Sequence, residues 1–132
     1  ISFYPVVSAE DDPDDKKFPY TAIIGSLRYQ LGSGTRTASS DRIQGFDSAG
    51  RLEISLPDST RLKVTDDDSV TVTSASGSVT RKIRIEKNLG VGQIFLSTGF
   101  NGNDAMNLLA LSDITNPGSP GWKTARVKIE KA

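Results

Sequence analysis

The residues best suited to chemistry lie between Gly25 and Thr37, directly after the apolar run Tyr20 to Gly25. This segment combines glycines and hydroxyl side chains with two arginines, Arg28 and Arg36. Glycine lets a backbone approach a ligand closely, amide and hydroxyl groups donate hydrogen bonds, and arginine binds anionic oxygens in a forked geometry. The pattern is therefore typical of a chain that binds a phosphate group or a pterin-like ring. A surface loop without a ligand has the same composition, so both interpretations stay open at this point.

The glycine spacing in this segment matches neither of two common phosphate-binding motifs. The dinucleotide fingerprint and the P-loop each require their own spacing, and the P-loop also ends in Gly-Lys-Ser/Thr. The sequence Gly32-Ser33-Gly34-Thr35 satisfies neither requirement. The segment is thus a candidate anion site without a recognised nucleotide motif.

A second candidate is Asn107, which lies inside the apolar patch from Ala105 to Leu111. We expect this patch to form a helical turn that fills the core. A buried asparagine must satisfy its amide, either on nearby backbone groups or on a ligand, and the backbone is the commoner partner. Asn107 is therefore a candidate binding residue with a structural alternative.

Composition excludes several kinds of chemistry from this chain. Its 132 residues include no cysteine and no histidine. Zinc sites, thiolate-held clusters, disulfides, Ser/His or Cys catalysis and histidine acid–base chemistry are excluded, and we expect no catalytic residue and no metal ligand here. Sixteen basic and sixteen acidic residues cancel, which argues against nucleic acid as a partner. No apolar run approaches the roughly 20 residues of a membrane helix, so direct membrane insertion is not expected.

The first seventeen residues differ in composition from the rest. Five acidic residues surround Pro13 and are followed by Lys16 and Lys17. These acids lack a glycine at the turning position of a calcium loop, so we interpret residues 1–17 as a solvated acidic linker from a preceding domain. Residues 18–132 then form one domain. Because the only methionine is Met106, we expect the chain to be a fragment or a processed product.

The middle of the chain predicts the unit around which the domain is built. Leu52, Ile54 and Leu56 alternate with polar residues, as in a half-buried strand. Ser55 is a helix cap because Asp58 follows it by three residues and Pro57 falls in the first turn. A strand and a short capped helix are therefore expected here.

Further strands are expected where turn residues separate short apolar segments. The run at 20–25 is compact and buried, and in the other segments apolar residues alternate with polar neighbours. The expected strands are 20–25, 70–73, 79–85, 91–98 and 123–129, with turns at 66–68 and 74–77. About six short strands that must hide their edges favour a closed, mainly β barrel with one or two short helices.

These segments resemble, in order, the C-terminal molybdopterin-dinucleotide-binding domain of molybdenum and tungsten oxidoreductases. The resemblance runs from about Phe18 to Lys131. The family's strand ending in Gly-Arg and its Gly-Thr-x-Thr segment are similar to residues 24–37, and its Asn-Pro-x-Asp helix start is similar to residues 53–62. Its Asp-Gly-Asp turn before a Val-x-Val strand is similar to residues 66–72. The family's phenylalanine, Asn-Leu pair and final lysine resemble Phe100, Asn107-Leu108 and Lys123.

The resemblance implies a double-psi β-barrel that holds a molybdopterin guanine dinucleotide, with molybdenum or tungsten, while other domains perform the redox chemistry. Glycine and hydroxyl residues would receive phosphate or pterin oxygens, Asn107 would pair with a pterin edge, and Lys123 would place a positive charge beside the dinucleotide. The residues implied as cofactor contacts are Gly25, Ser26, Gln30, Gly32, Ser33, Gly34, Thr35, Thr37, Asn107 and Lys123.

The sequence departs from the family pattern at several of these positions. Ser26 replaces an arginine, Gln30 and Gly32 replace histidines, and Ala38-Ser39 replaces an arginine pair. Arg28 and Arg36 are close enough in sequence to substitute for the missing charge. Asp67 replaces the glycine between two acids and must then adopt a left-handed turn, which aspartate tolerates.

Three functions follow from the sequence. The first is the cofactor-holding domain of a molybdopterin oxidoreductase related to formate dehydrogenases and nitrate reductases. The second is a structural homologue that has lost the cofactor, as in the large subunit of NADH-quinone oxidoreductase. The third is an independent β-barrel used in protein binding. In the first two, the partners are upstream domains or a large subunit of the same oxidoreductase. We expect a cytoplasmic location, with the periplasm as the alternative.

Overall fold

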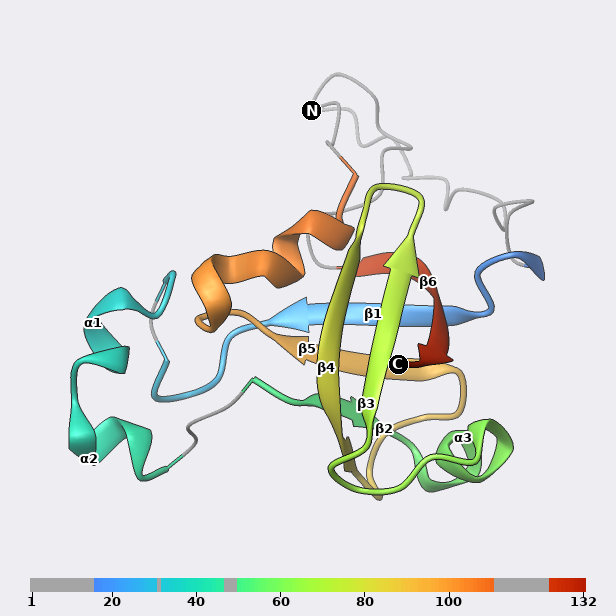
Figure 1. Cartoon of the computed structure of the whole chain (residues 1–132), viewed down its shortest axis with the longest axis horizontal. Helices are drawn as coiled ribbons and strands as arrows, with labels where there is room; N and C mark the ends of the chain where they lie inside the picture. The colour runs from blue at the N-terminus through green and yellow to red at the C-terminus, as the bar shows by residue number, and fades with distance from the viewer. Residues whose placement is uncertain (1–15, 31, 47–49, 111–123) are drawn as a thin grey trace, which may run out of the picture.

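The computed structural model describes residues 16–30, 32–46, 50–110 and 124–132. Within these residues six strands close into one barrel, and short helices connect them (Figure 1). The elements in chain order are β1 Tyr20–Gly25, α1 Thr35–Ala38, α2 Asp41–Gln44, β2 Leu52–Ile54, α3 Leu56–Leu62, β3 Ser69–Ser74, β4 Ser78–Ile85, β5 Gln93–Ser97, η2 Asn101–Leu108 and β6 Thr124–Lys131.

The strands close the barrel in the order β1-β5-β2-β4-β3-β6, so that β6 returns to β1. β1 pairs in parallel with β5, and β2 pairs in parallel with β4. The other four neighbouring pairs are antiparallel. The mainly β, closed six-stranded barrel predicted from the sequence is confirmed. β1 and β5 are distant in the sequence but are parallel neighbours in the barrel. The segments that follow them therefore leave the barrel at the same end (Figure 1).

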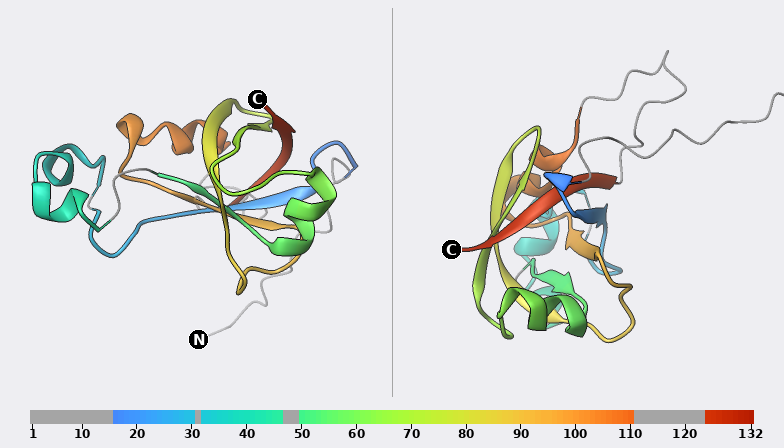
Figure 2. Two further views of the ribbon diagram at one scale, coloured as in Figure 1. Left: turned by 60° about the horizontal axis from the view of Figure 1, so that its bottom comes forward. Right: turned by 90° about the vertical axis from the view of Figure 1, so that its right-hand side faces the viewer.

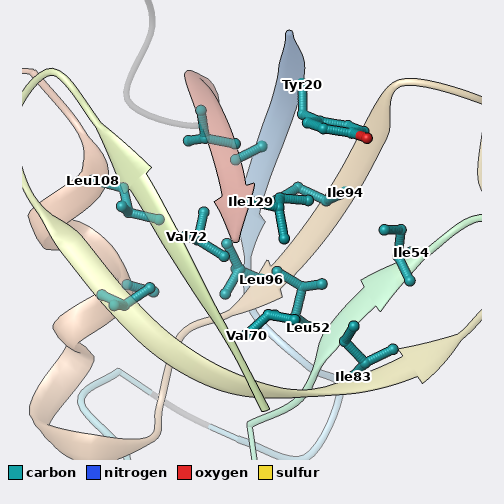
Figure 3. Close-up of a cluster of buried hydrophobic side chains, with 14 of the residues drawn as sticks. Tyr20, Leu52, Ile54, Val70, Val72, Ile83, Ile94, Leu96, Leu108 and Ile129 are labelled. Carbon is teal, nitrogen blue, oxygen red and sulfur yellow. The ribbon is translucent and has the colours of Figure 1, made fainter. Parts of the chain in front are cut away.

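The core lies inside the barrel and follows the period-2 alternation of the strands. β1 buries every second residue, and β4 buries Val79, Arg81 and Ile83 in the same way. Figure 3 shows side chains from different strands meeting in one apolar cluster. Leu52, Ile54 and Leu96 are completely buried there. Leu56 is an exception to the predicted alternation, because it begins α3 and is exposed.

The turn chemistry predicted around α3 is present. Ser55 caps the helix, and its hydroxyl oxygen accepts a hydrogen bond from the backbone N–H of Asp58 at 3.3 Å. Pro57 lies in the first turn, where its missing N–H costs nothing. Asp67 adopts a left-handed conformation with φ 67°, as the replacement of the family glycine requires. Val64 then enters the core after the helix ends.

Two elements were not expected from the sequence. Residues 35–38 and 41–44 form single helical turns, α1 and α2, where a polar loop was predicted. Both lie beyond the end of the barrel at which β1 finishes, opposite α3 (Figures 1 and 2). Four-residue helices carry no apolar stripe long enough to be recognised as periodic.

Arg81 is the polar exception within the core. It occupies an inward-facing position of β4 and is 4% exposed. Its guanidinium binds both carboxylate oxygens of Asp104 in η2, with Nη1 2.8 Å from Oδ2. η2 therefore covers this side of the barrel, held by a buried ion pair as well as by Ala105 and Leu108, which face the core.

Candidate functional site

The candidate site is built where the parallel strands β1 and β5 end. Gly25 is the last residue of β1 and pairs in register with Ser97, the last residue of β5. The next residue, Thr98, donates its backbone N–H to the Gly25 carbonyl at 2.8 Å, and its hydroxyl lies 3.3 Å from the same oxygen. The loop after β1 and the turn after β5 therefore start side by side.

These two segments cross at a point where only glycine fits. Gly34 has φ 80°, and a Cβ added there would lie 1.7 Å from the carbonyl oxygen of Gly99. Gly99 itself has φ 92° and approaches the side chain of Gln30. Side chains at either position would force the segments apart, because neither the left-handed backbone nor the distance allows one. Gly34, which was predicted from the sequence, and Gly99, which was not, form the centre of the loop structure.

Two of the predicted contact residues hold the loop together from inside. Gln30 and Thr37 are both 3% exposed. The Thr37 hydroxyl donates to Oε1 of Gln30 at 2.5 Å and lies 3.1 Å from the carbonyl oxygen of Gly34. Their polar groups thus fix the path of residues 30–37. Gln30 stands where the family has a histidine, and its amide serves the loop's own hydrogen bonding.

Other predicted residues present their polar groups to solvent. Ser26, Gly32, Ser33 and Thr35 are all exposed. The hydroxyls of Ser33 and Thr35 lie 2.9 Å apart. A pair of exposed hydroxyls beside left-handed glycines is a set of hydrogen-bond donors that an anionic ligand can reach. The structure therefore separates the predicted loop residues into supporting and exposed ones.

Asn107 lies elsewhere on η2. The expectation that its side chain is buried is wrong: Ala105 and Leu108 face the core, and Asn107 between them is exposed. A Cβ added at Gly77 in the β3–β4 hairpin would lie 2.7 Å from the Asn107 carbonyl oxygen. Asn107 is thus beside the hairpin, at the opposite end of η2 from Gly99. Lys123 lies outside the described residues.

Asn103, which no sequence pattern singled out, is the asparagine that touches the loop crossing. Its Oδ1 accepts a hydrogen bond from the backbone N–H of Gly99 at 2.7 Å. It adopts a left-handed conformation with φ 63°, which asparagine tolerates better than most residues. The Gly-Phe-Asn-Gly-Asn run at 99–103 was the available signal, since such residues mark tight turns.

A pocket of about 260 Å³ adjoins the loop. Sequence patterns did not single out its two aromatic residues. Two aromatic rings form part of its wall: Tyr29 and Phe46 stack with centroids 4.7 Å apart at an angle of 22°. They are 17 positions apart in the sequence, and only the turns α1 and α2 bring them together. The lining residues are Leu27, Arg28, Tyr29, Gln30, Ile43 and Phe46.

Charge around the site favours an anion. Between Ser26 and Phe46 the sequence has three arginines, Arg28, Arg36 and Arg42, and one acid, Asp41, which gives a net charge of +2. All three arginines are exposed. Arg28 lies over the ring of Tyr29 with its Cζ 5.7 Å from the centroid. The exposed donors and the positive charge together fit a ligand with anionic oxygens.

No cluster of three or more acidic, cysteine or histidine side chains suited to a metal ion occurs in the described part of the chain. Within the same residues, none of the helices is both long enough and apolar enough to cross a membrane.

At one end the barrel therefore carries crossing glycine loops with exposed hydroxyl donors and a net positive charge. The family model described as "Molydopterin dinucleotide binding domain" matches residues 20–127. The chain therefore belongs to the family of molybdopterin dinucleotide binding domains. The family and the cofactor class predicted from the sequence, a molybdopterin dinucleotide, are both confirmed.

Two curated relatives are similar over most of this chain. The F420-dependent formate dehydrogenase 1 subunit alpha of Methanococcus maripaludis is 27% identical over 129 residues, which cover 91% of this chain and 18% of that protein. The F420-dependent formate dehydrogenase subunit alpha of Methanocaldococcus jannaschii is 29% identical over 120 residues, with 89% and 17% covered. The chain thus spans less than a fifth of the length of these relatives.

A solved structure supports the fold. Acetylene hydratase from Pelobacter acetylenicus superposes with a TM-score of 0.69 at 13% identity, over 91% of this chain and 19% of that one. At this identity the likeness concerns the barrel alone. It shows that the same arrangement of strands occurs as one part of a much longer chain.

Proposed function

We propose that this domain holds a molybdopterin guanine dinucleotide, with molybdenum or tungsten, inside an oxidoreductase related to formate dehydrogenases. The family match and the two archaeal relatives support this proposal. When bound, such a cofactor supplies a redox-active metal held by its dithiolene sulfurs. The chain itself has no histidine or cysteine, so its part is to bind and orient the cofactor while other domains supply the chemistry.

The observation that carries the proposal is the crossing of Gly34 and Gly99. The crossing holds the loop after β1 against the turn after β5, and the exposed hydroxyls of Ser33 and Thr35 lie 2.9 Å apart on that loop. Those donors would bind phosphate or pterin oxygens. Arg28 and Arg36 would neutralise the negative charge of the ligand, in place of the arginines that the family pattern has and this chain lacks. Gly25, Gln30 and Thr37 would act by shaping the loop. The roles of Ser26, Asn107 and Lys123 stay predictions.

The whole protein's partners follow from the same proposal. Residues 1–17 would connect the barrel to preceding domains, or to a large subunit, of the same oxidoreductase. The much greater length of the curated relatives supports this arrangement. A cytoplasmic location is part of the proposal, with the periplasm as the alternative.

Nuclear magnetic resonance of the isotope-labelled chain, titrated with purified molybdopterin guanine dinucleotide, tests the proposal. Amide signals of residues 25–37 and 98–103 should shift, while those of Ser55 to Leu62 in α3 should not. Gly34→Ala should abolish the shifts. Gly92→Ala is the matched control, since Gly92 also has a left-handed backbone, with φ 79°, but open space around its Cβ and a position before β5.

Each alternative function gives a different outcome. If the wild-type chain stays silent at cofactor concentrations that load a known relative's domain, the proposal fails. A homologue that has lost its cofactor, or an independent interaction module, then explains the chain. Shifts confined to α3 and its neighbours would also contradict the proposed site.

A further inference from the structure

The pocket beside the glycine loop has a composition suited to a flat ring. Leu27 and Ile43 contribute aliphatic wall, and Tyr29 and Phe46 contribute two stacked aromatic rings. Its volume of about 260 Å³ is below the roughly 300–1,000 Å³ of pockets that take a drug-sized ligand. One ring system fits such a space, and a whole dinucleotide does not.

The aromatic pair presents area that the fold of this domain leaves uncovered. Tyr29 is 48% exposed and Phe46 is 60% exposed, although each covers one face of the other. The remaining ring surface can continue the stack with another planar group, which is how proteins bind nucleobases without depending on hydrogen-bond patterns.

Arg28 supplies the charge at the rim of the same pocket. Its guanidinium lies 5.7 Å from the Tyr29 ring centroid and is exposed. An arginine held against an aromatic ring keeps its outer N–H groups available for a phosphate. Gln30, the buried wall residue, is at the same time the side chain packed against Gly99 and bonded to Thr37. The pocket is therefore continuous with the glycine loop rather than a separate surface feature.

We propose that this pocket is a stacking subsite for one fused two-ring heterocycle of the cofactor, with Arg28 on the phosphate next to it. The proposal rests on the proposed function and assigns Tyr29, Phe46 and Arg28 to it, three residues that the family pattern does not single out. Both ends of the dinucleotide, the guanine and the pterin, carry such a ring close to a phosphate. The experiment distinguishes the two.

The test uses the 132-residue chain and five probes: GMP, guanosine, a phosphorylated pterin, inorganic phosphate and the complete molybdopterin guanine dinucleotide. Nuclear Overhauser contacts between the Tyr29 ring and the probe's ring protons report stacking directly, and shift titrations give each Kd. For the preferred nucleotide or pterin probe, Tyr29→Leu and Phe46→Leu should weaken binding by about 5- to 150-fold, the effect of one stacking contact. Tyr29→Phe should retain wild-type affinity because it keeps the ring.

The variants also separate ring from charge. Arg28→Gln should weaken GMP binding but leave guanosine binding unchanged, if the guanine end occupies the pocket. Val91→Ala is the matched control, because Val91 is an exposed apolar residue, 66% exposed, that does not line the pocket. It should change no Kd. Stronger contacts with GMP than with the pterin assign the guanine end, and the reverse assigns the pterin end.

Failure of this inference differs from failure of the proposed function. If the complete cofactor binds the Tyr29→Leu and Phe46→Leu variants as tightly as wild type, while Gly34→Ala abolishes binding, the subsite is wrong and the cofactor site stands. Binding of inorganic phosphate with the same affinity as both GMP and the phosphorylated pterin would also overturn the subsite, because it would leave the ring without a role.

Discussion

The two ends of the barrel are built on the same strands but differ in how their polar groups are satisfied. At the closed end, which comprises Ser55, α3 and the turn at Gly92, the buried carboxylate of Asp58 accepts hydrogen bonds from the Ser55 hydroxyl and the Gly92 backbone N–H, both at 2.7 Å. At the open end, which comprises residues 25–46 and 98–103, two aromatic rings and three arginines remain exposed. Figure 2 shows these ends on opposite sides of the strands.

The contrast separates stability from binding. The closed end satisfies its polar groups within the domain, and Arg61 adds a contact to Asp58 at 2.5 Å while also reaching the Tyr20 hydroxyl at 3.2 Å. That hydroxyl is the main reason the pKa of Arg61 is raised, and the nearby Asp58 adds to it. At the open end the backbone is instead ordered by the crossing of Gly34 and Gly99, and the side-chain donors stay exposed to a group from outside the domain. β5 connects the two ends, because Gly92, which contacts Asp58, comes just before this strand and Gly99 comes just after it.

Removing the carboxylate at the closed end should produce one of the two largest losses of stability. Asp58→Ala leaves the Gly92 N–H and the Ser55 hydroxyl without their buried acceptor, and we expect about 3 kcal/mol less free energy of unfolding. Urea unfolding followed by circular dichroism measures it. Glu130→Ala removes an acid from an exposed pair with Lys128 and should cost under about 0.5 kcal/mol. Equal effects of the two variants would refute the buried network.

The ion pair under η2 should give an asymmetric result. Asp104→Asn leaves the buried guanidinium of Arg81 without its countercharge, so we expect a loss of about 3 kcal/mol in the free energy of unfolding. Arg81→Met removes that charge and fills its volume, while the partly exposed Asp104 can turn to water, so about 1 kcal/mol is expected. Denaturant unfolding of both variants measures these two losses in the free energy of unfolding. The reverse order would mean that Arg81 is not buried as described.

At the open end, the sharpest comparison is between two glycines in one loop. Gly32 and Gly34 both have positive φ, but a Cβ at Gly32 meets nothing within 4 Å, whereas one at Gly34 meets the Gly99 carbonyl. Gly32→Ala should therefore cost about 1 kcal/mol of unfolding free energy from backbone strain alone, and Gly34→Ala about 2 kcal/mol or more. Only Gly34→Ala should also displace the amide signals of residues 98–103. Equal displacement in both variants would contradict the crossing.

Sequence patterns predicted the strands, their turns and the closed end far better than the open end. The cap at Ser55, the left-handed Asp67 and the alternation of Leu52 with Ile54 are local rules, and each one holds in the structure. The open end depends on contacts between distant residues. Tyr29 reaches Phe46 only because α1 and α2 turn the chain back, and Gly34 needs glycine only because Gly99 passes beside it.

Asn107 is a residue for which a local sequence pattern gave a wrong prediction. Its apolar neighbours suggested burial, but the helix that carries it has 3₁₀ character, in which residues three apart share one face. Ala105 and Leu108 take that face, and Asn107 is turned outward. Which asparagine touches the loop was decided by the turn at residues 99–103, where Asn103 contacts Gly99. The apolar pattern could not predict which of the two asparagines contacts the loop, because adjacent residues of η2 point to different faces.

Acid should act outside the open end, through Asp68 in the turn before β3, with the smallest effect of the set. The backbone N–H of Thr65 and the Lys131 ammonium, 2.9 Å and 3.2 Å from its Oδ2, lower the pKa of Asp68 below its ordinary value of 3.8. A carboxyl whose folded pKa is depressed stabilises the fold above its unfolded pKa and loses that contribution as the pH falls through the folded value. Asp68→Asn should therefore be slightly less stable than wild type at pH 7, and the two should converge below pH 3.8.

Thermal unfolding of both proteins between neutral and acidic pH measures this convergence. Glu130→Gln provides the control, because it removes the charge of a β6 acid that forms only an exposed ion pair with Lys128 in the described part of the chain. A gap between wild type and Asp68→Asn that stays constant with pH would show that the Thr65 and Lys131 contacts act through shape and not through charge. The glycine-loop amide signals should stay unchanged in Asp68→Asn at pH 7, because Asp68 belongs to the turn before β3 and binds Thr65 and Lys131. Movement of those signals would mean that the turn at Asp68 is coupled to the open end through the barrel, and the separation of stability from binding would fail.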